Sequence, residues 1–288
     1  MKTYIDCIPC FLNQSLKVVR KVGKDELFQA GIMKEILAAL STADFSRPPP
    51  QLKSLVDGII SRKTGISDLY EQDKKYSNDL VMPLYPDLKQ QVDKSDDPFS
   101  TALRLAIAGN VVDFGAYGSV DFADIRRSLD QAMTQSLDQE SIERLRRGIN
   151  LAGSILYVGD NSGEIVLDKL FIENLPMEKI TFAVRGKPCI NDVLMEDAAA
   201  VGITNLVEVI DSGSGIPGTV LEECSPEFVK KFRESDLIIA KGQGNYETLN
   251  DSDKNICFLF KIKCPVVAED TGVPLDDISL IWSAGKAN

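Results

Sequence analysis

Histidine is absent from the 288 residues of this chain. No imidazole is present to act as a general base, to activate a nucleophile or to bind a metal ion. The absence excludes Ser-His-Asp and Cys-His catalysis, and it excludes zinc sites with histidine ligands. Any acid–base or metal chemistry must therefore use the side chains of Asp, Glu, Asn, Lys, Tyr or Cys.

Long apolar segments are missing as well. No apolar run approaches the ~20 residues that a membrane-spanning helix needs. Residues 1–6 do not begin the apolar segment of a secretory signal. We therefore expect a cytoplasmic protein that has no membrane partner.

Excess positive charge is the third feature that the chain lacks. Its 43 acidic residues outnumber its 32 basic residues, and the formal net charge is -11. Nucleic-acid binding depends on clustered cations that displace counterions, so we expect no nucleic-acid partner. A small anionic ligand remains compatible with this charge because one pocket can be positive on an acidic surface. The oligomeric state is left open.

The six cysteines include one close pair, Cys7 and Cys10. Without a secretory signal, six thiols do not indicate a disulfide framework. A complete zinc site needs a second pair, and a redox CxxC motif normally follows a strand, whereas this one precedes a helix. The pair keeps two interpretations: two ordinary thiols, or a non-enzymatic metal or redox module. The cysteines at 189, 224, 257 and 264 are expected to be buried apolar side chains.

The spacing of apolar residues predicts an α/β fold. Helical spacing covers residues 11–22, 25–40, 51–63, 68–91, 98–110 and two further helices within 121–149. Short apolar runs rich in Ile and Val predict buried parallel strands at 155–158, 180–184, 206–210, 237–240 and 266–268, with helices between them. We therefore predict a helical N-terminal domain over residues 1–98. A three-layer α/β/α Rossmann-like sheet domain is predicted over residues 99–288.

Polar residues follow four of the predicted strands, at the edge where such sheets bind ligands. The first strand leads into Gly159-Asp160-Asn161-Ser162-Gly163-Glu164. Asp160 offers a carboxylate and Asn161 an amide oxygen, both of which suit a hard divalent ion. Backbone N–H groups of the next helix favour a phosphate at the same point. The same residue types also serve ordinary turns and helix caps.

Further candidates follow the second and fourth predicted strands. Asn191 and Asp192 are suitable helix caps. Asp197 lies among alanines inside a predicted helix, where we expect no capping role, so it either faces solvent or completes an oxygen site with Asp160. Lys241 ends an apolar strand, and a lysine there can neutralise phosphate charge. The glycines after it let the backbone approach a ligand, but this is not a P-loop.

Two further positions carry polar groups near these segments. Glu247 follows the glycine loop and is a candidate base or supporting group. Asn110 and Asp113 interrupt an apolar stretch, so each is either buried with a partner or directed into a cleft. Helix capping explains Asn110 almost as well.

Taken together, these motifs resemble the damage-control phosphatase family, also catalogued as domain of unknown function 89, in its prokaryotic CxxC-bearing branch. The segments that carry the resemblance are Cys7-x-x-Cys10, Gly109-Asn110-x-x-Asp113-Phe114-Gly115, the Asp160 motif, Arg185-Gly186-Lys187-Pro188-x-x-Asn191-Asp192 with Asp197, Lys241-Gly242-Gln243-Gly244-Asn245-x-Glu247, and Lys263-Cys264-Pro265-Val266. The resemblance covers nearly the whole chain. Each motif alone is weak, whereas their order and spacing together are specific.

The resemblance implies a phosphatase that uses one divalent ion (Mg²⁺, Mn²⁺, Co²⁺ or Ni²⁺) and acts on small phosphorylated metabolites. Sugar phosphates, phosphopantetheine derivatives and damaged metabolites are the implied substrates. By motif, the implied metal ligands are Asp160, Asn161 and Asp197, which are catalytic together with Lys241. The implied substrate contacts are Asn110, Arg185, Asn191 and Glu247.

The mechanism and two rival functions stay open at this point. Water attacks the phosphorus directly, or a carboxylate first forms a phosphoenzyme, and we favour water because a tight metal ligand is a poor nucleophile. A Rossmann-like sheet also suits an S-adenosylmethionine-dependent methyltransferase, which needs no divalent ion. The non-enzymatic alternative is the metal or redox module of Cys7 and Cys10.

Overall fold

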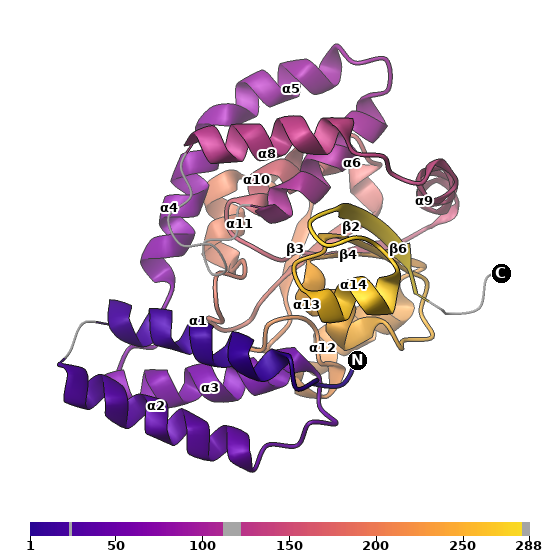
Figure 1. Cartoon of the computed structure of the whole chain (residues 1–288). Coiled ribbons are helices and arrows are strands. Elements are labelled where there is room, and N and C mark those ends of the chain that lie inside the picture. The colour runs from indigo at the N-terminus through magenta and orange to yellow at the C-terminus, as the bar shows by residue number, and fades with distance from the viewer. Residues whose placement is uncertain (23–24, 112–121, 284–288) are drawn as a thin grey trace.

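A computed structural model describes residues 1–22, 25–111 and 122–283 (Figure 1). The first three helices are α1 (Cys7–Lys21), α2 (Glu26–Ser41) and α3 (Pro49–Thr64), and they form a bundle at the lower left of Figure 1. Their buried apolar side chains form one core, which runs from Phe11 to Tyr70. Proline at its first turn begins α3, and Gly65, in the left-handed conformation, ends it.

The next helices cover one face of the sheet, some of them by packing on other helices and not on the strands. They are α4 (Glu71–Val81), α5 (Tyr85–Asp93), α6 (Pro98–Ala108), α8 (Phe122–Thr134) and α9 (Gln139–Leu151). Short 3₁₀ turns are η1 (Met82–Leu84), η2 (Gly109–Val111), η3 (Met177–Lys179), η4 (Ile203–Asn205) and η5 (Leu221–Glu223). Val81, Leu84 and Val92 pack in the core of the sheet. The bundle core therefore ends well before the predicted domain boundary after residue 98, which stays a prediction.

The central sheet has six strands in the order β3-β2-β1-β4-β5-β6. The strands are β1 (Ile155–Val158), β2 (Ile180–Val184), β3 (Glu208–Asp211), β4 (Leu237–Lys241), β5 (Ile256–Lys261) and β6 (Ile278–Trp282). Neighbours pair in parallel except β5 with β6. Val158 lies beside Ala183 on one side and Ala240 on the other, so the carboxyl ends of β2, β1 and β4 align.

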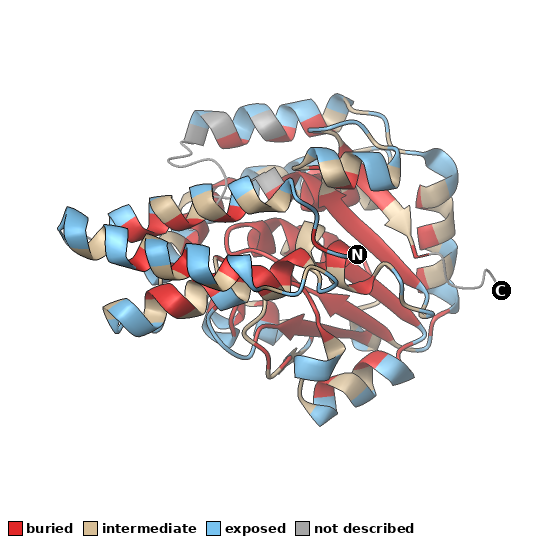
Figure 2. Cartoon of the chain, turned by 60° about the horizontal axis from the view of Figure 1, so that its bottom comes forward, coloured by how far each residue is buried: buried red, intermediate tan, exposed pale blue. Residues whose placement is uncertain are grey.

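Helices cover both faces of this sheet. The helices that follow the strands are α10 (Glu164–Ile172), α11 (Met195–Val201), α12 (Pro226–Glu234), α13 (Gln243–Leu249) and α14 (Pro265–Thr271). Alternate residues of β1 belong to different cores: Ile155 and Tyr157 to one, Leu156 and Val158 to the other. Figure 2 shows most of the sheet as buried strands between the helices, whereas β3 is exposed or partly exposed. The predicted α/β class with a three-layer sheet is confirmed.

One predicted strand is wrong, and two strands were not predicted. Residues 266–268 lie inside α14, and the sheet positions beyond β4 belong to β5 and β6. Pro265 occupies the first turn of α14, where its fixed φ and missing N–H favour a helix start. A short apolar run does not distinguish a strand from a buried helix by periodicity alone.

Candidate active site

The predicted site residues gather where the strand order reverses, between β1 and β4. Sheets of this kind bind ligands in the crevice at that point. Asp160 and Asn161 follow β1 directly, while Lys241 is the last residue of β4 and Gly242 follows it. The parallel pairing of β1 with β4 brings the two turns together.

Asp160 lies in a buried cluster of carboxylate and amide groups. The Asn110 side-chain amide donates to Asp160 Oδ2 (2.9 Å) and to Glu164 Oε2 (2.9 Å). Asn161 Nδ2 donates to the same two oxygens, at 2.6 and 3.1 Å. All four side chains are at most 7% exposed. The structure therefore joins three predicted residues, and it adds Glu164, whose role in the quoted turn was not predicted.

Gly242 is required for the close packing of β4 against Asp160. Its φ is +79°, a region that L side chains rarely adopt. A Cβ atom at this position would lie 1.9 Å from Asp160 Oδ2. No side chain fits between the two strand ends, so the glycine allows the carboxylate to occupy the crevice.

The charge around Asp160 is unbalanced toward the negative. Burial raises the pKa of Asp160 well above its usual value, and the charges of Asp192 and Glu164 raise it further. Lys263 and Arg185 oppose this only in part. A divalent cation would restore the ionised carboxylate, and a carboxylate with amide oxygens suits Mg²⁺-like ions, which keep several waters. Among the described residues, no three Cys, Asp or Glu side chains are arranged to hold a metal ion.

Lys241 lies beneath the cluster and does not reach the crevice. Its ammonium donates to the Ala106 carbonyl (2.9 Å) and to Asp168 Oδ1 (2.6 Å), and it pairs with Glu164. Three acceptors use its three protons, and the side chain is fully buried. Burial lowers the pKa of Lys241, but Asp168 and Glu164 outweigh this and raise it. These contacts weaken the prediction that Lys241 is a direct phosphate partner, which stays a prediction.

Asp197 also differs from its prediction. Its carboxylate accepts from the Leu194 backbone N–H (2.9 Å) and from Asn78 Nδ2 (2.8 Å), so it does cap α11. The expectation that it has no capping role is wrong. Asn78 in turn accepts from the Gly163 N–H (2.7 Å), which links Asp197 to the Asp160 turn from behind. Its predicted role as a metal ligand stays a prediction.

The Arg185 side chain is committed to protein partners. Its Nε donates to Asp192 Oδ2 (2.6 Å), and its terminal nitrogens donate to Thr219 Oγ1 (3.3 Å) and Asn245 Oδ1 (3.2 Å). Arg185 is 3% exposed and Asp192 is fully buried. The guanidinium therefore fixes the position of Asp192, and its predicted substrate contact stays a prediction.

The loop of Asn191 and Asp192 lies against the turn after β1. Asn161 and Asp192 form an isolated β-bridge, and the Asn191 carbonyl accepts from the Ser162 N–H (2.9 Å). The N–H groups of Ser162 and Gly163 are thus both occupied, which weakens the prediction that this helix start binds phosphate. Asp113, the other polar residue of the Asn110 motif, lies outside the described residues.

A cavity of about 830 Å³ opens onto Asp160, Asn161 and Asp192. Its opposite wall is formed by α1 and α3, which include Cys7, Cys10, Lys17 and Lys53. Glu247, Lys263 and Cys264 complete the side nearest α13 and α14. The helical bundle therefore contributes to the site, which sequence reasoning did not predict. Lys263 belongs to the motif Lys263-Cys264-Pro265-Val266, and no sequence signal assigned it a role.

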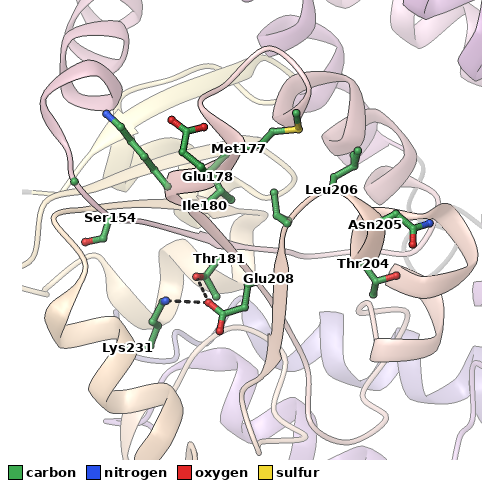
Figure 3. Close-up of a pocket in the computed structure, with 13 residues that line it drawn as sticks. Ser154, Met177, Glu178, Ile180, Thr181, Thr204, Asn205, Leu206, Glu208 and Lys231 are labelled. Carbon is green, nitrogen blue, oxygen red and sulfur yellow. Dashed lines mark hydrogen bonds and ion pairs between the residues drawn. The ribbon is translucent and has the colours of Figure 1, made fainter.

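A second hollow, of about 450 Å³, lies at the opposite end of the strands (Figure 3). There Glu208 accepts from Thr181 Oγ1 (2.7 Å) and Lys231 Nζ (3.1 Å), as the dashed lines in Figure 3 mark. These two hydrogen bonds lower the pKa of Glu208. The group is solvated and satisfied, so this hollow shows none of the charge imbalance found at Asp160.

No helix in the described ranges has the length and apolar character needed to cross a bilayer. This agrees with the expectation from the apolar runs of the sequence.

Comparisons with known proteins agree with this geometry. The chain is 33% identical to a damage-control phosphatase of Archaeoglobus fulgidus, over 94% of this chain and 96% of that protein. It is 34% identical to the damage-control phosphatase PH1575 of Pyrococcus horikoshii, over 95% of this chain and 96% of that protein. The crystal structure of PH1575 is described as that of a domain of unknown function 89 protein. It superposes on this chain with a TM-score of 0.89 at 30% sequence identity, and the match covers 98% of this chain and 99% of that chain. A family model described as the damage-control phosphatase ARMT1-like domain matches residues 3–278. The chain therefore belongs to the damage-control phosphatase ARMT1-like family.

Proposed function

We propose that this protein is a divalent-metal-dependent phosphatase that hydrolyses phosphate monoesters of small metabolites. The observation that carries the proposal is the buried Asp160 carboxylate, whose pKa is raised by burial and by two neighbouring negative charges at the mouth of a large cavity. Membership of a phosphatase family supports the reaction class. Lys263, which lowers the pKa of Asp160, supplies positive charge where a phosphoryl group would enter.

The metal ligands in this proposal are Asp160, Asn161 and a third carboxylate. Asp192 suits that position better than Asp197, because Asp192 lines the same cavity as the pair and forms a bridge with Asn161. Both oxygens of Asp197 already accept hydrogen bonds behind the turn. Asp197 is then a positioning residue that acts through Asn78.

A bound divalent ion would supply Lewis-acid activation of a phosphoryl oxygen or of water. The residues of the chain do the rest. Asn110 and Asn161 hold the carboxylates in place, Lys241 neutralises Glu164 from below, and Lys263 attracts the phosphate. Charge that develops on the phosphoryl oxygens is thus met by groups that are already in position.

A metal-by-substrate screen tests the proposal. Phosphate monoesters, including p-nitrophenyl phosphate and sugar phosphates, are assayed with chelator and then with Mg²⁺, Mn²⁺, Co²⁺ or Ni²⁺ restored. We expect hydrolysis only with a metal present. The proposal is contradicted if the chelator does not reduce hydrolysis. It is also contradicted if no combination of metal ion and phosphate monoester gives hydrolysis. Calorimetry with S-adenosylmethionine in chelator tests the methyltransferase alternative in the same preparation.

The choice of third ligand has its own measurement. Titration of Mn²⁺ by electron paramagnetic resonance gives the metal affinity of Asp192→Asn and Asp197→Asn without relying on turnover. We expect Asp192→Asn to weaken binding by more than Asp197→Asn, for which the loss of a supporting contact costs about 10- to 100-fold at most. The reverse order restores Asp197 as the ligand.

A further inference from the structure

Glu247 is a buried carboxylic acid in the wall of the cavity. It lies on α13, five residues after Gly242, the glycine that abuts Asp160. At 1.5 Å per residue this places it ~7.5 Å further along the helix axis. The side chain is 8% exposed and borders the same cavity as Asp160. The shared cavity of about 830 Å³ has room for a phosphoryl group beside Asp160 and its leaving group beside Glu247.

The Gln243 side chain links Glu247 to the segment that carries Lys263. Its Nε2 donates to Glu247 Oε1 (2.8 Å), and its Oε1 accepts from the Lys263 backbone N–H (3.0 Å). One amide side chain therefore fixes both the carboxyl group and the segment that carries Lys263. Glu247 is held at a set position relative to the place where the phosphate would bind.

The surroundings of Glu247 keep a substantial fraction of it protonated near neutral pH. Burial raises its pKa to about 7, while the Gln243 hydrogen bond and the N-terminal ammonium of Met1 lower it in part. The other titratable groups that face it are the thiols of Cys7 and Cys10 on α1 and of Cys264 before α14. A carboxylic acid of this acidity donates a proton efficiently near neutral pH.

We propose that Glu247 is the general acid that protonates the leaving oxygen of the substrate, a role that rests on the proposed phosphatase function. Water adds its hydroxyl oxygen to phosphorus, and the bond from phosphorus to the ester oxygen breaks with its electron pair on that oxygen. The Glu247 proton joins this oxygen to give the alcohol. The attacking water releases one proton to solvent, and Glu247 takes one back. The preferred substrates are then esters of alkyl alcohols, whose alkoxides leave poorly without a proton.

Leaving-group dependence tests this role. Glu247→Gln is compared with the unchanged protein on p-nitrophenyl phosphate, whose phenolate leaves without a proton, and on the best alkyl or sugar phosphate of the screen. We expect kcat for the alkyl ester to fall by about 10²- to 10⁴-fold, with a far smaller loss for the aryl ester. Glu247→Asp should recover part of the alkyl activity. Glu208→Gln, at the opposite end of the sheet, is the matched control and should change neither rate.

The pH dependence separates acid catalysis from a structural role. For the alkyl ester, kcat of the unchanged protein should fall as pH rises through about 7, and Glu247→Gln should lose this limb. Equal losses on both esters in a folded Glu247→Gln variant, or an unchanged basic limb, overturn the role while the phosphatase function stands. If the unchanged protein hydrolyses neither ester with any metal, the phosphatase function fails and this role fails with it.

Discussion

The two ends of the central sheet carry similar residue types in opposite physical states. At the amino end, Glu208 is exposed beside Thr181 and Lys231, and its pKa is lowered. At the carboxyl end, Asp160 is buried beside other negative charges, and its pKa is raised. A solvated ion pair stabilises a fold weakly, whereas a buried and poorly compensated carboxylate costs stability. The comparison shows that the carboxyl end keeps a charge imbalance that costs stability, whereas the amino end does not.

Removal of a lysine at each end gives the largest expected contrast. Lys241→Met leaves the Glu164 and Asp168 carboxylates buried without their cation, and burial already raises the pKa of Asp168 to about 6. We expect the free energy of unfolding to fall by about 3–5 kcal/mol. The control Lys231→Met breaks an exposed pair and should cost about 0–1 kcal/mol. Urea denaturation measures the free energy of unfolding of both variants. Equal losses would show that the buried ion pairs stabilise the fold no more than the exposed pair does.

Substitution of one carboxylate at each end tests function instead of stability. Asp160→Asn keeps the shape of the side chain but removes the charge that we expect to bind the metal. We expect kcat/KM to fall by about 10²- to 10³-fold, or about 3–4 kcal/mol of barrier. The thermal midpoint should stay equal or rise, because the lost charge is unfavourable in the folded state. Glu208→Gln should leave activity unchanged, and full activity of Asp160→Asn would remove Asp160 from the site.

Two glycines at positive φ distinguish an ordinary left-handed turn from the tight contact at the site. Gly242→Ala and Gly272→Ala place alanine at φ values of +79° and +70°, but only the first puts Cβ against Asp160. Gly272→Ala should lose about 1–2 kcal/mol of stability from the left-handed backbone. Gly242→Ala should lose more, because its ψ of 157° lies in a region that essentially only glycine adopts. Gly242→Ala alone should also lose about 10- to 100-fold in kcat/KM, since it displaces the carboxylate. Similar kinetics in the two variants would show that this contact does not matter.

The sequence was sufficient to place the edge of the site but not the direction of its side chains. Strands β1 and β2 match their predicted bounds because their apolar runs end at polar turns. The position of Lys241 at a strand end was also right. Its long side chain, however, runs under the sheet edge to Asp168, and no local pattern reports that contact. Asp197 was misjudged because α11 begins only at Met195, which places Asp197 in the first turn, where it caps the helix. Its second partner, Asn78, lies 119 residues away.

The contribution of α1 to the cavity could not be predicted either. Helical spacing shows which face of a helix is apolar, but it does not show what the polar face meets. Cys7 and Cys10 were therefore assessed as an isolated motif, whereas the structure places them across the cavity from Asp160. This placement leads to the smallest expected effect.

Serine at both positions should change little. Burial raises the pKa of Cys7 and Cys10 above the usual thiol value, so few of these thiols are ionised at neutral pH and both are poor nucleophiles and ligands. Cys7→Ser/Cys10→Ser should therefore keep kcat/KM within about two-fold, in line with substitutions that alter free energy by about 0.5 kcal/mol. Metal content is measured on the same samples as activity. It should equal that of the unchanged protein in this variant and fall in Asp160→Asn. The opposite pattern, metal lost with the thiols and kept without Asp160, would move the functional centre to α1 and would make the carboxyl end of the sheet a structural feature.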